Sequence, residues 1–195
     1  MRRRALTFEG KKVNGSGWAK IARRIRVPLG FGFAAVYLWL AGPTWWSIAA
    51  GGAVAFFGLL LRGVASGHVQ KNRELTTSGP YAYTRNPLYL GSIIIAAGFA
   101  LAARSVVIAL AIAVIFVAVY LPVILAEEAH LRAEFSAFTA YSQQVPRLLP
   151  RLSAASGEPV AFSRDLYLKH REYNAAIGTI AMIAALAAKI LWFNR

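Results

Sequence analysis

Long uncharged runs alternate with short polar segments along this chain. No charged residue lies in residues 27–61, and the Gly-Pro-Thr break at residues 42–44 divides this run into two halves, each long enough to cross a bilayer as a helix. Two more uncharged runs, residues 86–103 and 105–126, are separated only by Arg104, which leaves room for a tight turn between antiparallel helices. The pattern predicts two helical hairpins, and therefore four membrane spans.

A further apolar run covers residues 175–193. Lys189 interrupts it close to its end, where a lysine stem can stay in hydrocarbon while the ammonium group reaches the interface. The segment either spans the bilayer or lies flat on it; spanning is favoured because the run is long enough and Trp192 and Phe193 suit an interface. The sequence therefore predicts an all-α, polytopic membrane protein with about five transmembrane helices.

Composition agrees with this class, and the charges indicate an orientation. The chain is 57% hydrophobic and 15% charged, which is unusual for a soluble protein. Its net charge is +14, with basic residues before the first span and in residues 62–85 and 132–171, but none in the turn at residues 42–44. The positive-inside rule places the basic segments in the cytosol. Because the basic residues are spread over loops without a reader motif, we expect no nucleic-acid partner.

These boundaries divide the chain into segments and leave two polar stretches as candidates for chemistry. Residues 63–85 follow the second span, and residues 126–144 follow the fourth. In the latter, Leu131, Phe135 and Phe138 have the spacing of one helical face, which predicts a helix continuing out of the membrane. The expected segments are a basic arm (1–26), a membrane core (27–150), a cytosolic linker (151–174) and a C-terminal transmembrane or interfacial helix (175–195).

Glu127 and Glu128 stand where the apolar fourth span ends. On a helix, Glu128 shares a face with the apolar residues that follow it. Burying a carboxylate without a partner costs several kcal/mol. Two interpretations therefore remain open: a contact to a polar or cationic ligand, or an ion pair with Arg85, Arg132 or Arg147.

The stretch GPYAYTRNPLYLG, residues 79–91, stands at the start of the third span. Its two prolines exclude a continuous helix, so its backbone groups need partners in the protein or in a polar cavity. Tyr81, Tyr83 and Tyr89 are candidates to line such a cavity. Arg85 and Asn86 are candidates to donate hydrogen bonds to an anion or amide. The alternative is an interfacial aromatic belt followed by a helix that begins at proline.

Several common sites are excluded or disfavoured. The chain has no cysteine, which excludes disulfides, thiolate metal sites and cysteine nucleophiles. The Walker A, HExxH and GxSxG patterns are absent. His68, His130 and His170 lie far apart in sequence, so a metal site requires the fold to gather them. We therefore expect no metal.

Two segments, LTTSGPYAYTRNPLYLG at residues 75–91 and AEEAHLRAEFSAFTAYSQQVPRLLP at residues 126–150, stand in this order with two spans between them. Together they resemble the isoprenylcysteine carboxyl methyltransferase family of integral membrane enzymes and its bacterial relatives. The resemblance covers about residues 67–150. It implies a helical fold in which two cytosolic segments close over S-adenosylmethionine while a lipophilic acceptor approaches from the bilayer, so that residues 27–150 form a membrane methyltransferase core.

The resemblance also implies roles for particular residues. Glu127 or Glu128 would accept hydrogen bonds from the cofactor's amine or ribose, and Arg85 would meet its carboxylate. Tyr81 or Tyr89 would pack on adenine or sulfonium. The cofactor-binding residues expected in this way are Leu75, Gly79, Pro80, Tyr81, Arg85, Asn86, Tyr89, Glu127 and Glu128. The expected catalytic residues are Glu128 and Arg147, with Arg147 orienting an anionic acceptor.

The chain departs from the family at Asn86, where the best-known members have histidine. Asparagine keeps a donor and an acceptor but carries no charge. The main prediction is an S-adenosylmethionine-dependent methyltransferase of the bacterial inner membrane, with a cytosolic N-terminus and active site, acting on a lipophilic or prenylated acceptor such as an isoprenylcysteine-type carboxylate. The alternatives are a phospholipid or small-amphiphile N- or O-methyltransferase, a non-catalytic lipid-binding protein and, more distantly, a membrane reductase.

Overall fold

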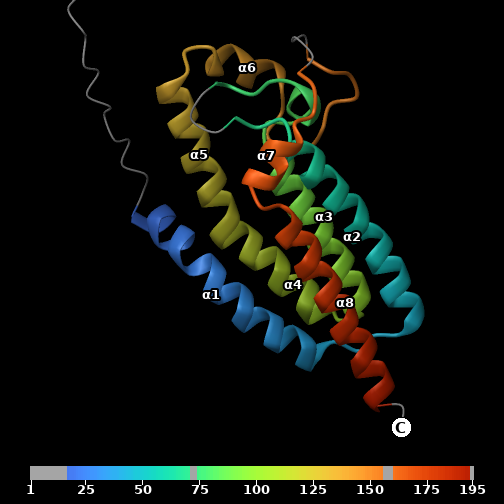
Figure 1. Cartoon of the computed structure of the whole chain (residues 1–195). Helices are drawn as coiled ribbons and strands as arrows, with labels where there is room; N and C mark the ends of the chain where they lie inside the picture. Colours follow the sequence, from blue (N-terminus) through green and yellow to red (C-terminus); the bar gives the residue numbers. More distant parts are fainter. Residues whose placement is uncertain (1–16, 71–73, 156–159, 194–195) are drawn as a thin grey trace, which may run out of the picture.

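The chain folds into a bundle of long helices (Figure 1). The computed structural model describes residues 17–70, 74–155 and 160–193, and this part of the chain contains helices and no strand. Among the described residues, three helices are long and apolar enough to cross a membrane: Trp45–Ser66, Val106–Glu134 and Tyr173–Trp192. α3 (Pro87–Ala103) is a shorter apolar helix. The predicted all-α, polytopic membrane fold is confirmed.

The first hairpin breaks where the sequence predicts it. α1 (Gly17–Leu40) ends just before the Gly-Pro-Thr segment, and α2 (Trp45–Ser66) begins just after it. Thr44 caps α2, since its hydroxyl accepts the N–H of Ser47 while the Ser47 hydroxyl accepts the N–H of Thr44. This reciprocal pair satisfies backbone donors that the first helical turn leaves free. The Ser47 hydroxyl also donates to the Ala102 carbonyl, which ties this end of α2 to α3.

A lysine of the last helix, α8 (Tyr173–Phe193), contacts the end of the first helix. The Lys189 ammonium donates to the carbonyl oxygens of Leu38 at 2.6 Å, Trp39 at 3.0 Å and Ala41 at 2.7 Å. A cation at the carboxyl end of a helix is favourable because the last carbonyls have no partner within the helix. Lys189 therefore caps α1 as well as standing near the end of its own apolar run.

α1 is continuous across residues 26 and 27, where the sequence analysis divides a basic arm from the core. Residues 1–16 of that expected arm lie outside the described residues. At the other end of the chain, the expected linker 151–174 contains a short helix, α7 (Arg164–Lys169). The connections on both sides of the core therefore have helical parts.

α2 and α3 approach each other closely through glycines. Gly51 of α2 lies against Gly98 of α3, and Gly58 lies against Gly91. A Cβ atom on any of the four would overlap the facing helix, commonly at a backbone carbonyl. Small residues permit such close packing of membrane helices. The first turns of α3, which follow the polar stretch of the sequence, are thereby fixed against α2.

The second hairpin also turns as predicted. Arg104 adopts the left-handed conformation with φ of 53°, and Ser105 caps α4 (Val106–Ile115). α4 continues through a π-helical turn, η2 (Phe116–Tyr120), into α5 (Leu121–Glu134). An inserted π turn changes which side chains face the bundle and is frequent at functional sites.

The helix expected to run through residues 126–144 is interrupted, so this part of the prediction is wrong. α5 ends at Glu134, Phe135 is extended, and α6 (Phe138–Gln144) begins after a turn. Tertiary packing explains the break, because the turn buries Phe138 with Tyr141 and Val145 against Leu75. Leu131 and Phe135 still pack on this cluster, so their apolar spacing reflects one packed surface on a broken helix.

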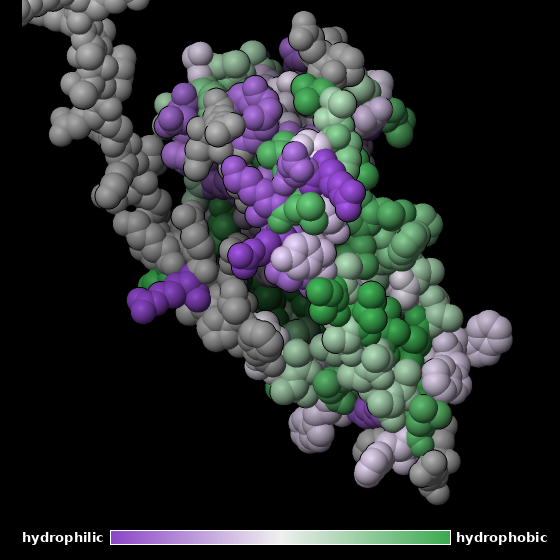
Figure 2. Space-filling view, in the orientation of Figure 1, coloured by the Kyte–Doolittle hydropathy of each residue, from purple (hydrophilic) through white to green (hydrophobic). Residues whose placement is uncertain are grey.

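Polar elements gather at one end of the bundle. The 3₁₀ turn η1 (Gly79–Ala82), α6 and the loops beside them lie beyond the ends of α2 and α5 (Figure 1). Hydrophilic side chains are concentrated on this end, whereas hydrophobic residues cover much of the helices below it (Figure 2). The candidate site lies at the boundary between these two zones.

Candidate functional site

A buried carboxylate forms the centre of the site. Glu128 is 5% exposed and receives hydrogen bonds from Arg147, with Nε 3.2 Å from both carboxylate oxygens and Nη2 3.1 Å from Oε2. Arg85 Nη1 lies 3.6 Å from Oε2, and Asn86 Nδ2 donates to Oε1 at 2.9 Å. The expected ion pair is therefore confirmed for Arg85 and Arg147, whereas the Arg132 guanidinium lies over the ring of Phe138. A buried ion is stable in this form because its oxygens are satisfied.

Backbone contacts hold the two polar segments together. The N–H of Arg85 donates to the Pro146 carbonyl at 2.9 Å, and the Thr84 hydroxyl donates to the Arg147 carbonyl at 3.1 Å. Asn86 Nδ2 also donates to the Arg147 carbonyl at 3.1 Å. The segment before α3 and the segment after α6 thus form one unit, which orients the side chains around Glu128.

Gly79 permits this path of the chain. Its φ is +58°, a conformation that glycine adopts without strain, and a Cβ atom would overlap the His68 ring. His68 is buried, and its Nδ1 lies 2.8 Å from the Val64 carbonyl. Pro80 follows as the second residue of η1, and its carbonyl accepts the N–H groups of Tyr83 and Thr84. These contacts hold the loop in place.

A cavity of about 130 Å³ opens beside Glu128, and we call it the polar pocket. It lies between the segment leading into α3 and the end of α5 with α6. Its walls include Leu75, Tyr81, Arg85, Asn86, Tyr89, Glu127 and Glu128, all expected from the sequence to bind a cofactor. Among the described residues, Gly79, Pro80 and Tyr83 lie outside these walls. Arg147 reaches Glu128 without lining the pocket.

The sequence analysis missed two aromatic walls of the polar pocket. Phe138 and Tyr141 line it, although their helical spacing indicates only an apolar face. The Tyr141 hydroxyl donates to the Tyr81 carbonyl at 2.7 Å. Burial raises the pKa of the Tyr81 phenol, and the Glu127 carboxylate raises it further; burial likewise raises the pKa of Tyr141. Both phenols therefore stay protonated, and the Tyr141 hydroxyl acts as a donor.

The two neighbouring glutamates have different surroundings. Glu128 is paired with two guanidinium groups. Glu127 accepts a hydrogen bond from the Tyr89 hydroxyl at 3.0 Å, and among the described residues it forms no ion pair. The pocket therefore combines one carboxylate that is paired with two guanidinium groups and one that is hydrogen-bonded to a phenol.

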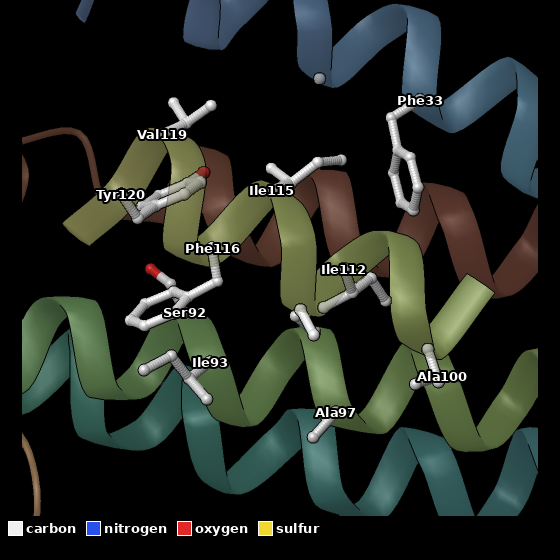
Figure 3. A pocket seen from close by; sticks show the side chains of 14 residues that line it. Phe33, Ser92, Ile93, Ala97, Ala100, Ile112, Ile115, Phe116, Val119 and Tyr120 are labelled. Atoms are coloured by element: carbon white, nitrogen blue, oxygen red, sulfur yellow. The ribbon is translucent and has the colours of Figure 1, made fainter. Parts of the chain in front are cut away.

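A larger cavity of about 500 Å³ lies between α1, α3 and α4 with η2, and we call it the apolar groove (Figure 3). Among the described residues, its walls carry no charged side chain; they include Phe33, Ala97, Ala100, Ile112 and Phe116. Many of the residues that line the groove are alanine, glycine or serine, and the cavity exists because their side chains are short. Its walls are suited to hydrocarbon rather than to a polar ligand.

The apolar groove ends beside the polar pocket. Tyr120 lines the groove and Tyr89 lines the pocket, and their ring centroids are 6.3 Å apart with an angle of 81° between the planes. Both rings pack on Val119 and Val123. We call this ring pair the tyrosine junction, because one tyrosine belongs to each cavity.

The fold gives no sign that the histidines form one site. His68 packs beside Gly79, and His170 Nδ1 lies 3.1 Å from the Ser66 carbonyl, whereas His130 lines the polar pocket. Within the ranges that the structure describes, no group of three or more potential ligand residues is placed to hold a metal ion.

Comparison with known proteins finds relatives that match part of the chain and a family model that matches more than half of it. The chain is 35% identical over 89 residues to the cobalt-zinc-cadmium resistance protein CzcN of Cupriavidus metallidurans, covering 46% of this chain and 41% of the relative. It is 34% identical over 89 residues to the nickel-cobalt-cadmium resistance protein NccN of Alcaligenes xylosoxydans xylosoxydans, covering 46% and 42%. The match spans about two fifths of each relative's length. No solved structure matches the chain.

The model of the phospholipid methyltransferase family matches residues 25–137, more than half of the chain. This range contains α1 from residue 25 onward, α2 to α5, the tyrosine junction and both glutamates, and it ends before α6 and Arg147. The match agrees with the resemblance seen in the two polar segments. The chain belongs to the phospholipid methyltransferase family, within the group of membrane methyltransferases that resemble isoprenylcysteine carboxyl methyltransferases.

Proposed function

We propose that this protein transfers a methyl group from S-adenosylmethionine to a lipophilic acceptor. Family membership supports a membrane methyltransferase. The observation that carries the cofactor assignment is Arg85, whose side chain is 10% exposed and whose Nε has no hydrogen-bond partner among the described residues. A buried donor without a partner costs roughly 1 to 3 kcal/mol. A ligand that accepts a hydrogen bond from this group is therefore favoured.

The polar pocket has groups that fit S-adenosylmethionine. Arg85 suits the cofactor's carboxylate, because a guanidinium forms strong charge-assisted hydrogen bonds. The rings of Tyr81 and Tyr89 offer faces for adenine or for the sulfonium charge. Leu75 and Phe138 add apolar wall. The donor set and the aromatic walls together support this cofactor.

The cofactor, when bound, supplies an electrophilic methyl group. The protein's task is to align the acceptor with that group and to exclude water. Glu128 keeps Arg85 in place, and Asn86 and Arg147 in turn hold Glu128. We therefore infer that Glu128 and Arg147 position the other residues of the site. The Arg147 side chain is also 42% exposed, so it stays a candidate to orient an anionic acceptor.

The apolar groove supports a lipophilic acceptor. It lies within the bundle between helices that include membrane spans, and it ends at the tyrosine junction. The hydrocarbon part of an isoprenylcysteine-type carboxylate, a phospholipid or a smaller amphiphile suits its walls equally. The charge pattern of the sequence supports a site on the cytosolic side of the bacterial inner membrane.

Calorimetric titration of the detergent-purified protein with S-adenosylmethionine tests this proposal. We expect binding by the parent protein and a loss of at least about tenfold in affinity for Arg85→Ala, since a charged hydrogen bond contributes about 1.5 to 3 kcal/mol. The matched control is Arg104→Ala, in the exposed turn between α3 and α4, which should bind as the parent does. No binding by the folded parent, even with bilayer lipid restored, would overturn the cofactor assignment and favour a non-catalytic lipid-binding protein.

A further inference from the structure

The apolar space between α1 and α4 is divided in two. Besides the apolar groove, a second cavity of about 360 Å³ lies between these helices, and we call it the distal cavity. Its walls include Val36, Tyr37, Ile108 and Ala111. Among the described residues, Phe33 and Ile115 are the two that line both cavities. These two side chains therefore form the wall between the apolar groove and the distal cavity.

The distal cavity continues the line of the groove away from the tyrosine junction. The end of α1 lies beside the start of α4, because the N–H of Gly42 donates to the Ala103 carbonyl at 2.9 Å. The walls of the distal cavity reach Leu40, the last residue of α1. Figure 3 shows Phe33 at the end of the groove that lies away from Tyr120. A chain that enters the groove at the tyrosine junction therefore meets Phe33 before it reaches the distal cavity.

The ring of Phe33 is held in place beside open space. It packs on Tyr37 with ring centroids 6.2 Å apart, and the Tyr37 hydroxyl donates to the Phe99 carbonyl at 2.9 Å. Gly30 lines the groove and Gly32 lines the distal cavity, and a Cβ atom on either would meet no described atom within 4 Å. A large, fixed ring thus interrupts a path that the neighbouring glycines of α1 leave open.

The length of the groove matches one leaflet of a bilayer. Its walls on α4 and η2 extend from Ala109 to Tyr120, which at about 1.5 Å per residue is about 16 Å. The hydrocarbon core of a bilayer is about 30 Å thick, so one leaflet accounts for about 15 Å. A hydrocarbon chain as long as those of membrane lipids therefore fits between the tyrosine junction and Phe33.

We propose that Phe33, together with Ile115, sets the upper limit on the chain length of the methyl acceptor. The acceptor is then a lipophile with one chain in the groove, and this chain is no longer than one leaflet. This inference rests on the proposed function and specifies its substrate class. Shorter chains fit along the uniform apolar wall, whereas a longer chain has to leave the groove at Phe33 and loses packing contacts there.

Straight-chain alcohols test this inference, because their neutral head group removes any effect of charge in the polar pocket. Native mass spectrometry of the cofactor-free protein in detergent, with an equimolar mixture of hexadecanol and tetracosanol, gives the ratio in which the two chains bind. Partitioning into the detergent is the same for every variant and cancels when variants are compared. We expect the parent protein to bind hexadecanol in preference.

The variants open or refill the distal cavity. Phe33→Ala should raise the ratio of tetracosanol to hexadecanol at least about threefold, a gain from packing alone because the chain leaves a micelle rather than water. Adding Gly32→Leu should restore the parent ratio, since leucine fills the distal cavity. Gly32→Leu by itself should bind both alcohols as the parent does. Ile115→Ala removes the other half of the wall and should act in the same direction as Phe33→Ala.

A ratio unchanged in folded Phe33→Ala, or a gain that survives the addition of Gly32→Leu, would overturn the inference. A parent protein that binds neither alcohol, or that prefers tetracosanol, would overturn it as well. If Phe33→Ala does not fold, an unchanged ratio in Ile115→Ala decides against the inference.

Calorimetry with S-adenosylmethionine separates this inference from the proposed function. If the alcohol ratios change as expected but the parent protein binds no cofactor, the proposed methyl transfer fails while the limit at Phe33 stands. If the parent binds the cofactor but the ratios do not change, the limit at Phe33 fails and the proposed methyl transfer stands.

Discussion

The polar pocket and the apolar groove are built by opposite means. Around the polar pocket, each position of Glu128, Asn86 and Arg85 is fixed by hydrogen bonds and ion pairs from two distant segments. The apolar groove has almost no such contacts; alanines and a glycine leave space between helices. Substitutions in the pocket should therefore act through lost partners, whereas substitutions in the groove should act through added volume.

This difference also indicates how the two cavities divide the reaction. Directional contacts are suited to a ligand with a fixed set of polar groups, and a smooth apolar wall is suited to chains that differ in length and branching. The tyrosine junction is the place where both requirements meet.

Glu128→Ala should have the largest effect. The substitution leaves the buried Arg85 without its carboxylate and removes the acceptor of Asn86 Nδ2. Breaking a buried ion pair on one side typically costs roughly 3 to 5 kcal/mol. Thermal unfolding in detergent should show this loss, and calorimetry should show no binding of S-adenosylmethionine. Glu134→Ala, on the exposed end of α5, serves as the control; equal stability of the two variants would refute the central role of Glu128.

Ala97→Phe should separate the apolar groove from the polar pocket. The new ring would occupy part of the groove, and displacing even two methylene groups of an acceptor, at about 0.8 kcal/mol each, lowers transfer about tenfold. Binding of S-adenosylmethionine should remain as in the parent protein. Leu110→Phe adds a ring to a side chain that is 62% exposed outside the groove walls and should change neither property. Reduced cofactor affinity in Ala97→Phe would mean that the two cavities are one site.

The sequence predicted the polar pocket better than the groove, and the reason is physical. Glu128, Arg85 and Asn86 are polar groups at the ends of apolar runs. Such groups need partners, so their meeting could be anticipated from the two polar segments. A groove made by Ala97 and Ala100 has no comparable signal, because alanine on a membrane helix also serves ordinary packing.

The helical fold shows the same contrast. The breaks at residues 42–44 and at Arg104 were predictable from local chemistry, and both are confirmed. The break at Phe135 was not, since nothing local forbids a helix there and the gain comes from burying Phe138 and Tyr141. The π turn at residues 116–120 likewise has no signature in its apolar sequence.

Asn86→His tests the departure from the family within the polar pocket. Asn86 Nδ2 donates to both Glu128 Oε1 and the Arg147 carbonyl. A neutral imidazole has one N–H, so one of these bonds is lost, and a net hydrogen bond contributes about 0.5 to 1.5 kcal/mol. We expect the affinity for S-adenosylmethionine to fall up to about tenfold in calorimetry, less than in Asn86→Ala. A gain in activity for the histidine variant would indicate instead that this site has decayed from an active ancestor.

The smallest effect is expected for an ion pair that involves Glu172, which lies outside the residues that match the family. Arg62 of α2 pairs with Glu172 before α8, with Nη2 at 2.7 Å from Oε2, and also donates to the Leu88 carbonyl and the Ser92 hydroxyl. Glu172→Gln removes the charge but leaves those two bonds, and because the pair is partly exposed to solvent the loss of stability should be at most about 1 kcal/mol.

The affinity for S-adenosylmethionine shows whether the Arg62–Glu172 ion pair affects the polar pocket. If the C-terminal helix only anchors the chain, Glu172→Gln should lower the unfolding temperature slightly, and S-adenosylmethionine should bind as it does to the parent. Glu134→Gln removes an equal charge on an exposed surface and provides the baseline for both measurements. A cofactor affinity reduced as far as in Asn86→His would contradict the view that the polar pocket depends on the two polar segments alone. Leu88 lines this pocket and its carbonyl accepts a hydrogen bond from Arg62, so it would then transmit the change from α8. The pocket would then have to be considered a product of the whole bundle rather than of two polar segments.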